Sequence, residues 1–277
     1  MALVGDAHKE SGQAAAPQAP APLRDGSLRR NVRLPQPALP PAAHSVTLRP
    51  RSQWGTMPVA PTTYGRSVLG LPLEVWRPRA RCELLVFAAI HGEEPETTWA
   101  LSRALRQLAT PPEHVAVVLA ANPDGLLRGT RANANGVDLN RNFPASNWRA
   151  GTVTSRATID APSDVVLSTG TAPASEPETQ ALLALITELR PDAVIALHAP
   201  LACIDDANTS ELGRRLAERT GMPLVPDVGY ATPGSFGSWG QEHGVPVITY
   251  EFPVIANEDT MALHVPVLVE LLTGTLP

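Results

Sequence analysis

Residues 84–108 read LLVFAAIHGEEPETTWALSRALRQL, which is an apolar run, a short polar turn and an amphipathic stretch in direct succession. The run over residues 84–90 has the length of a buried strand, and the leucines of residues 95–108 recur on one face of a helix. His91 and Glu94 lie in the turn, where the strand ends and the helix begins. The stretch therefore predicts a strand–helix unit of an α/β domain, with two potential metal ligands at the end of its strand.

The same alternation continues along the rest of the chain. Apolar runs of strand length occur at residues 115–121, 193–197 and 245–250. One further helix is predicted to begin at Ser175, where Ser175 and Glu178 have the spacing of a capping box, and another to span Ser210–Thr220 and end at Gly221. This alternation predicts an α/β fold with a mostly parallel sheet that is covered by helices on both faces.

Residues 1–60 differ in composition from the remainder of the chain. Ten of the 29 prolines lie between Pro17 and Pro61, interleaved with alanines. Such a segment buries too little apolar surface to offset the entropy lost when it is ordered, so we predict a disordered or extended N-terminal extension over residues 1–60. Residues 61–277 are predicted to form a single folded domain.

The bulk composition argues against several classes of protein. The 277 residues carry a net charge of -5, which does not indicate nucleic-acid binding. No apolar run approaches the ~20 residues that a membrane-spanning helix needs, so no membrane association is predicted. Cys82 and Cys203 are the only cysteines and are expected to be buried thiols of a reducing compartment. With no secretory signal pattern, we predict a cytoplasmic protein, and the sequence does not indicate its oligomeric state.

Three of the predicted strands end in side chains that bind metals or transfer protons. The first ends at His91 and Glu94, the third at His198 and the fourth at Glu251. Because the carboxyl ends of parallel strands meet at one edge of an open sheet, these side chains are expected to converge. Two imidazoles and a carboxylate are a ligand set of catalytic zinc sites, which leaves Glu251 as a candidate base.

The stretch Arg131–Pro144, RANANGVDLNRNFP, combines asparagines and arginines with apolar residues. A polar surface loop is one interpretation of this composition. An anion-binding surface is the other, because guanidinium groups bind carboxylates through two parallel hydrogen bonds. The residues alone leave both interpretations open.

These motifs occur in a particular order along the chain: His-x-x-Glu, then Arg131 ahead of Asp-x-Asn-Arg-Asn, then a distant histidine and a glutamate near the C-terminus. The arrangement resembles the M14 zinc carboxypeptidases, over residues 64–272. The resemblance implies the family's mixed, mostly parallel sheet flanked by helices on both faces, and one Zn²⁺ per chain bound by His91, Glu94 and His198. Glu251 is then the general base that accepts a proton from the water that zinc activates.

The resemblance also implies roles for the residues around the metal. Asp138 corresponds to the family aspartate that orients the first histidine ligand, although a loop-capping role is an equally simple interpretation. Arg131 corresponds to the arginine that polarises the scissile carbonyl. Asn140 and Arg141 correspond to the pair that binds the terminal α-carboxylate of the substrate. Tyr230 corresponds to the mobile tyrosine that closes over the substrate.

The predicted specificity pocket departs from that of the digestive carboxypeptidases. Phe236 stands where those enzymes place an aliphatic or acidic residue, which argues against a broad protein-digesting role. The blocks at residues 131–144, 175–182 and 232–239 instead resemble a bacterial branch of the family. They imply hydrolysis of the γ-D-glutamyl–meso-diaminopimelate bond in L-Ala-γ-D-Glu-meso-diaminopimelate, a small peptide of peptidoglycan recycling. Ser235 is a candidate for binding the second amino-acid head of diaminopimelate.

Two alternative functions stay open. A zinc deacylase of N-acyl amino acids, or a carboxypeptidase of other specificity, would share the His-Gly-x-Glu motif and the later histidine. A zinc-binding or peptide-binding protein without catalytic activity is the second alternative. The presence of both Glu251 and Arg131 argues against it, because a pure binding protein needs neither.

Overall fold

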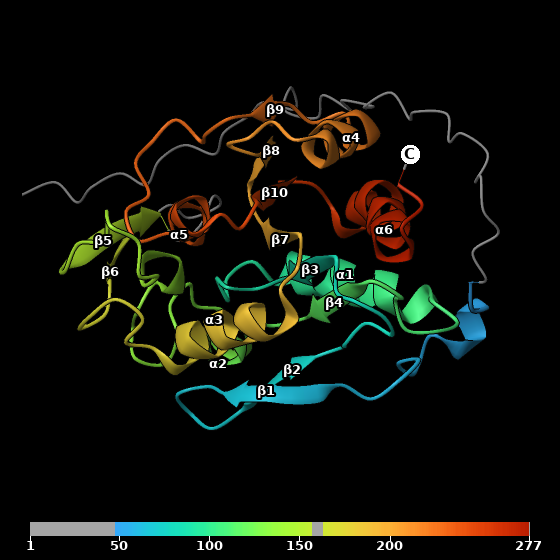
Figure 1. Ribbon diagram of the computed structural model, residues 1–277, viewed down its shortest axis with the longest axis horizontal. Coiled ribbons are helices and arrows are strands. Elements are labelled where there is room, and N and C mark those ends of the chain that lie inside the picture. Colours follow the sequence, from blue (N-terminus) through green and yellow to red (C-terminus); the bar gives the residue numbers. More distant parts are fainter. Residues whose placement is uncertain (1–47, 157–162, 277) are drawn as a thin grey trace, which may run out of the picture. The chain divides into compact units, whose positions relative to one another are not determined.

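The computed structural model describes residues 48–156 and 163–276, and its centre is a six-stranded sheet of order β4-β3-β7-β10-β8-β9 (Figure 1). Its strands are β3 (Leu84–Phe87), β4 (Val115–Val118), β7 (Ala193–His198), β8 (Leu201–Asp205), β9 (Leu224–Val225) and β10 (Val247–Pro253). The four strands β4, β3, β7 and β10 are mutually parallel. Strand β8 runs antiparallel to β10, and β9 is parallel to β8. The predicted mixed, mostly parallel sheet is confirmed.

Helices cover both faces of this sheet, and Figure 1 shows the two groups on its two sides. The first group is α1 (Pro95–Gln107), α4 (Glu211–Thr220) and α6 (Asn257–Thr273), and the second includes α3 (Pro177–Leu189) and α5 (Phe236–His243). Neighbouring residues of one strand point to opposite faces, so Val86 joins the first apolar core and Phe87 the second. Within the described part of the chain, no helix is both long and apolar enough to cross a membrane.

The helix termini test the predicted capping residues. Ser210 accepts a hydrogen bond from the Gly213 N–H at the start of α4, and Gly221 ends this helix with a φ of 72°, as predicted. Helix α3 exists, but the predicted capping box of Ser175 and Glu178 is wrong. Its N-cap residue, Glu176, makes no side-chain capping hydrogen bond. The Glu178 carboxylate instead accepts hydrogen bonds from the Val68 N–H and the Asn133 amide, because it joins two loops rather than capping its own helix.

Shorter elements that were not predicted from the sequence surround the main sheet. They are the antiparallel pairs β1 (Thr62–Arg66) with β2 (Pro72–Val75) and β5 (Thr152–Arg156) with β6 (Asp164–Ser168), the helix α2 (Pro123–Arg128), and the 3₁₀ turns η2 (Arg51–Gln53) and η3 (Leu139–Arg141). The predicted extension, residues 1–60, lies largely outside the described residues. In the described part of this extension, the Arg49 N–H donates a hydrogen bond to the Gln107 carbonyl at the end of α1. The division at residue 60 stays a prediction.

The register of the central strands determines where the site forms. Glu251 on β10 is the partner of His198 at the end of β7, and of Cys203 on β8. Strand β3, next to β7, leads through a short turn to His91 and then into α1. Three consecutive strands of the sheet thus deliver the predicted site residues to one edge, where carboxyl ends of parallel strands form binding sites.

Candidate functional site

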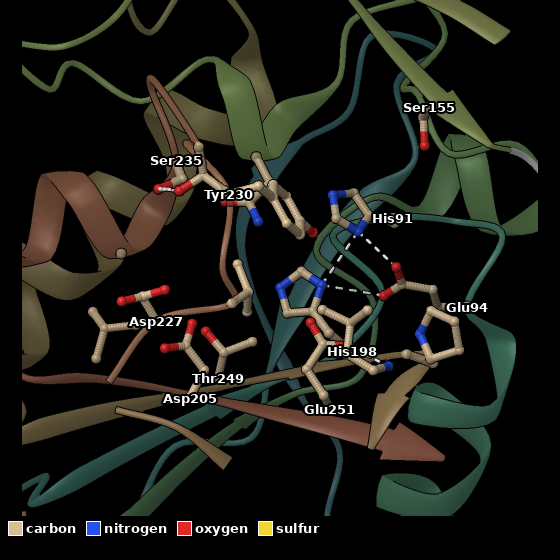
Figure 2. A pocket seen from close by; sticks show the side chains of 18 of the residues that line it. His91, Glu94, Ser155, His198, Asp205, Asp227, Tyr230, Ser235, Thr249 and Glu251 are labelled. Atoms are coloured by element: carbon tan, nitrogen blue, oxygen red, sulfur yellow. Dashed lines mark hydrogen bonds and ion pairs between the residues drawn. The ribbon is translucent and has the colours of Figure 1, made fainter. Parts of the chain in front are cut away.

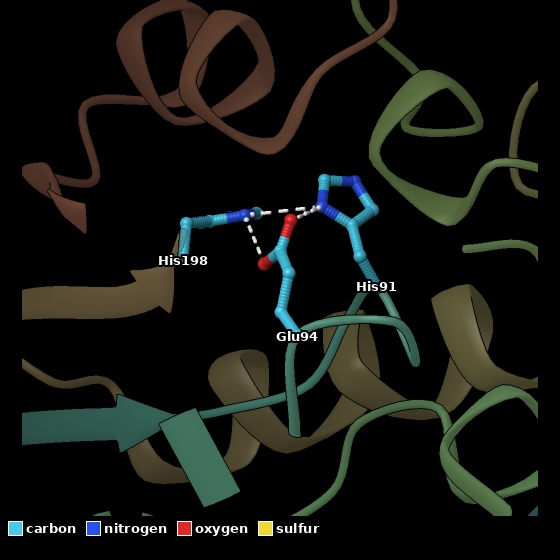
Figure 3. A group of neighbouring side chains, drawn as sticks. All are labelled: His91, Glu94 and His198. Carbon is cyan, nitrogen blue, oxygen red and sulfur yellow. Dashed lines mark hydrogen bonds and ion pairs between the residues drawn. The ribbon is translucent and has the colours of Figure 1, made fainter. Parts of the chain in front are cut away.

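Three buried side chains converge at this edge (Figure 3). His91 Nδ1 lies 2.7 Å from Glu94 Oε1, His198 Nδ1 lies 3.2 Å from Glu94 Oε2, and the two Nδ1 atoms are 3.2 Å apart. The ligand atoms of the three residues all lie within 4.8 Å of one another. The residues are only 2–4% exposed, so the surrounding core fixes their positions. Two imidazole nitrogens and one carboxylate therefore point at a common position.

The donor set fits a divalent cation. Glu94 Oε2 is buried and has no hydrogen-bond partner among the described residues. Burial raises the pKa of Glu94, but the neighbouring imidazoles outweigh this effect and lower it to about 2, so the carboxylate is ionised near neutral pH. A buried, ionised carboxylate that lies between two imidazoles and has one oxygen without a hydrogen-bond partner is stabilised by a metal ion. The set of two histidines and one glutamate, with further coordination positions open, is that of catalytic zinc, and it forms a single zinc site.

Asp138 connects the metal centre to Arg131. Its Oδ1 accepts a hydrogen bond from the Asn140 N–H at the start of η3 and lies 3.3 Å from His91 Nε2, although the latter contact is not aligned as a hydrogen bond. Its Oδ2 accepts a hydrogen bond of 2.9 Å from Arg131 Nε. Burial raises the pKa of Asp138, but Arg131 and His91 outweigh it and hold that pKa well below its ordinary value. The two interpretations of Asp138 are thus not exclusive: it caps a turn and faces a ligand histidine.

Glu251 lines the same cavity as the zinc ligands and is 7% exposed. Its Oε2 accepts a hydrogen bond of 3.3 Å from the Leu201 N–H on the adjacent strand. Burial raises the pKa of Glu251, and the Glu94 carboxylate raises it further, whereas His198 lowers it. A raised pKa suits a group that must both accept and donate a proton near neutral pH.

Asn140 and Arg141 lie on η3 and line the cavity. Asn140 Oδ1 accepts a hydrogen bond from the Phe236 N–H, so the amide group of Asn140 is left as a donor. Arg141 Nη1 donates to the Asn140 carbonyl, and within the described residues no carboxylate forms an ion pair with this guanidinium. Burial lowers the pKa of Arg141, but an arginine stays charged at physiological pH. The pair therefore presents N–H donors and an unneutralised positive charge to a ligand.

The remaining predicted residues occupy different places. Tyr230 lines the cavity and is 57% exposed, and Figure 2 shows its ring beside His91 and His198. Ser235 also lines the cavity, but its hydroxyl caps α5 by accepting from the Ser238 N–H. Phe236 differs from the prediction: its side chain is 2% exposed and packs on the rings of Phe87, Phe143 and Trp239. Residue 236 points inward because the first turn of α5 directs it to the core.

The cavity has a volume of about 1090 Å³ and includes residues that were not predicted from the sequence. Glu93 lies 3.4 Å from Arg131 Nη1. Asp205, Asp227 and Thr249 line the part of the cavity away from His91 and Glu94 (Figure 2). Residues 201–205 read LACID, and this short apolar run after His198 was a signal that could have predicted a strand ending at Asp205.

Comparison with known proteins gives a consistent picture. The zinc carboxypeptidase family model matches residues 56–202. Murein peptide amidase A of Escherichia coli K12 is 48% identical over 228 residues, which cover 81% of this chain and 94% of that enzyme. Murein peptide amidase A of Vibrio campbellii is 41% identical over 231 residues, covering 82% and 93%.

Solved structures agree with these sequence matches. The crystal structure of murein-tripeptide amidase from Escherichia coli O157 superposes with a TM-score of 0.78 at 46% identity, covering 82% of this chain and 98% of that one. Carboxypeptidase A from Helicoverpa armigera, at 18% identity and a TM-score of 0.58 over 79% of this chain and 67% of its own, shows the same fold. This chain belongs to the M14 family of zinc carboxypeptidases.

Proposed function

We propose that this protein is a murein tripeptide amidase. It hydrolyses the bond between γ-D-glutamate and meso-diaminopimelate in L-Ala-γ-D-Glu-meso-diaminopimelate and releases diaminopimelate. The relative from Escherichia coli K12 supports this substrate class, since the alignment covers 94% of its length. The observation that carries the proposal is the cavity itself, which the zinc ligands share with Arg141, a cation without a carboxylate partner among the described residues.

The residues around the zinc site have different roles in the hydrolysis. When bound, zinc lowers the pKa of a water molecule and polarises the scissile carbonyl. The Glu251 carboxylate accepts a proton from the attacking water and later donates it to the leaving amine, so its charge is restored at the end of each turnover. The Arg131 guanidinium is held by Asp138 and stabilises the negative charge that develops on the carbonyl oxygen.

Other residues position the substrate. Asn140 and Arg141 bind the α-carboxylate of the residue that is released, through the amide N–H groups and the guanidinium. This requirement matches diaminopimelate, whose α-carboxylate is free when it is the C-terminal residue. Tyr230 is exposed, lines the cavity and closes over the bound peptide.

The test compares two substrate classes with the zinc-loaded protein. Release of diaminopimelate from the free tripeptide is measured by chromatography, beside release of acetate from N-acetyl amino acids. We expect hydrolysis of the tripeptide and none of the acetylated amino acids. Hydrolysis of the acetylated amino acids with none of the tripeptide would show a deacylase and refute the proposal. Zinc binding with neither activity would favour the non-catalytic alternative.

We also propose that the protein works in the cytoplasm. Cys82 and Cys203 are both free and buried, which suits a reducing compartment. The peptide product of cell-wall turnover would be its substrate there. Fractionation of the native cells, followed by immunodetection, tests this location, and recovery from the extracytoplasmic fraction would contradict it.

A further inference from the structure

The cavity contains an acidic region that the proposed mechanism does not use. Asp205 ends β8, and its Cα atom is the antiparallel partner of Thr249 on β10. Asp227 lies after β9 and also lines the cavity. Figure 2 shows Asp205, Asp227 and Thr249 together on the side of His198 that is away from Glu94. Two carboxylates thus lie in the substrate cavity at a distance from the metal ligands.

The register of the strands places Asp205 relative to the catalytic base. Directly paired residues of an antiparallel sheet share a face, and so do residues two apart along one strand. Glu251 pairs with Cys203, and Thr249 pairs with Asp205, so Asp205 and Glu251 project from the same face. The two pairs are separated by two residues of strand, which is about 7 Å. The Asp205 side chain therefore projects from the same face as the Glu251 side chain, about 7 Å further along the strand direction.

The carboxylate of Asp205 differs from its neighbour Asp206 in having no protein partner. Asp206 accepts hydrogen bonds from the N–H groups of Asn208 and Ser210 and from the hydroxyl of Ser210, the N-cap residue of α4. Among residues 48–156 and 163–276, none donates a hydrogen bond to the Asp205 side chain, and no cation forms an ion pair with it. Asp205 lines the cavity and is available to a ligand.

The charges around Asp205 favour a cation there. Burial raises its pKa to about 6, and the carboxylates of Glu251 and Asp227 contribute to this increase. An ammonium group next to Asp205 would relieve the repulsion among these carboxylates. At the same time, Arg141 offers a positive charge to an anionic group in the same cavity. The cavity thus suits a residue that carries a carboxylate and, further along its side chain, an ammonium group.

We propose that Asp205 is a specificity-determining residue that binds a distal ammonium group on the side chain of the released residue. This inference rests on the proposed function and specifies its substrate. In meso-diaminopimelate, three methylene groups separate the two amino-acid heads, a span of about 5 Å at ordinary bond lengths. The α-carboxylate binds to Asn140 and Arg141, and the distal ammonium group reaches Asp205. Asp227, which is exposed and accepts the Gly229 N–H, plays a smaller part.

The Ser235 hydroxyl, which was predicted to bind the second amino-acid head, already has hydrogen-bond partners in the protein. Ser235 Oγ accepts a hydrogen bond from the Thr232 hydroxyl and interacts with Ser238 Oγ. The Asn147 amide donates to Ser238 Oγ. These groups form a network that stabilises the start of α5, so they offer no charge and few free acceptors to an ammonium group. The unpartnered Asp205 carboxylate is the stronger acceptor.

The test uses two tripeptides that differ only in the distal amino group. One ends in meso-diaminopimelate and the other in 2-aminopimelate, which keeps both carboxylates. We expect the zinc-loaded wild type to prefer the first peptide in kcat/KM by ~100-fold, because a site that binds an N–H group discriminates strongly against an analogue without it. In Asp205→Asn, which keeps the side-chain shape, this ratio should fall to below ~5-fold.

The controls separate the possible outcomes. Glu218→Gln removes an exposed charge on α4 and should keep the wild-type ratio. Equal kcat/KM for the two peptides in the wild type, or an unchanged ratio in Asp205→Asn with normal zinc content, overturns the inference while the proposed function stands. A larger loss of preference in Asp227→Asn than in Asp205→Asn would also overturn the assignment to Asp205. Absence of hydrolysis of either peptide by the wild type would instead refute the proposed function.

Discussion

Strand β10 separates two buried histidine sites that have different surroundings. On one face, the Tyr250 hydroxyl shares a hydrogen bond of 2.7 Å with His264 Nδ1, and Phe252 stacks on the same imidazole. On the other face, Glu251 lies beside His198, whose Nδ1 faces the Glu94 carboxylate. Alternation along one strand thus directs Tyr250 into a closed apolar core and Glu251 into the catalytic cavity.

The difference shows that burial alone does not make a histidine a ligand. Burial lowers the pKa of His264 to about 4, since no carboxylate compensates for the loss of solvation, and its ring stays neutral in the core. His91 and His198 instead lie on either side of the Glu94 carboxylate, which is ionised and has one oxygen without a hydrogen-bond partner among the described residues. A metal site therefore requires a carboxylate and a second donor aimed at the same position, together with access for a substrate.

The largest effect that would test this contrast is expected for Glu251→Gln. Glutamine keeps the size of the side chain but cannot accept the proton, so kcat for the tripeptide should fall by about 10³-fold or more. Zinc content should stay at one ion per chain, because Glu251 is not a ligand. Steady-state kinetics and metal analysis measure the two quantities, with Glu218→Gln as the control. Unchanged turnover would remove Glu251 from its role as the base.

A smaller effect is expected for Arg141→Gln, which removes the positive charge but keeps a donor. We expect kcat/KM for the tripeptide to fall by about 100-fold, mainly through KM, because a charge-assisted contact with the α-carboxylate is lost. A tripeptide with an amidated C-terminus tests the cause. The wild type should hydrolyse it poorly, and Arg141→Gln should discriminate little between the acid and the amide. Retained discrimination would place the carboxylate contact elsewhere.

The next effect concerns zinc affinity rather than turnover. In Asp138→Asn, the side chain loses the charge that faces His91 Nε2 and Arg131 Nε, so zinc affinity should fall by about 10- to 100-fold. Competition with a chromophoric chelator measures this affinity. Asp206→Asn is the matched control, because Asp206 is similarly buried but binds Ser210, the N-cap residue of α4, and not a zinc ligand. Equal losses in both variants would mean that Asp138 acts through stability alone.

The parts of the site that could be predicted from sequence lie at the ends of parallel strands. His198 and Glu251 follow apolar runs, and the topology of a parallel sheet necessarily brings such ends together. The link from Asp138 to Arg131 was not predictable from residue patterns, because a loop of asparagines and arginines has no period that specifies its geometry. The family resemblance supplied the separate roles of Asp138 and Arg131, but not the hydrogen bond between them.

The parts that sequence reasoning missed depend on the direction of side chains in unpredicted elements. Asp205 was not predicted because β8 has only five residues, and its first four are all apolar, so the sequence shows no alternation that would place Asp205 on one face. Phe236 was assigned to the pocket, whereas α5, a helix that was not predicted, turns its ring into the aromatic core. Alignment with a family gives a residue's position along the chain. The face of the helix or strand on which its side chain lies also depends on where that helix or strand begins.

The smallest expected effect lies on the other face of β10 and concerns stability alone. The pKa of His264 is about 4 in the folded protein, against an ordinary value of 6.5 in an unfolded chain, so the unfolded chain binds more protons between these values. The contribution of the neutral His264 ring to the free energy of unfolding is therefore fully present above pH 6.5. It is lost as pH falls toward 4, by about 1.4 kcal/mol for each pH unit. His264→Asn keeps an acceptor for Tyr250 but cannot titrate, so this part of the slope should disappear.

Urea unfolding of the metal-free protein between pH 7 and 5.5 measures the slope, since excess chelator removes the pH dependence of zinc binding from the comparison. His114→Asn, which removes an exposed imidazole, controls for the loss of one histidine. Turnover at pH 7 should be unchanged in His264→Asn, because the sheet separates its ring from the cavity. A wild-type slope in His264→Asn would mean that folding does not change the protonation of the His264 imidazole, and the contrast between the two faces of β10 would then fail.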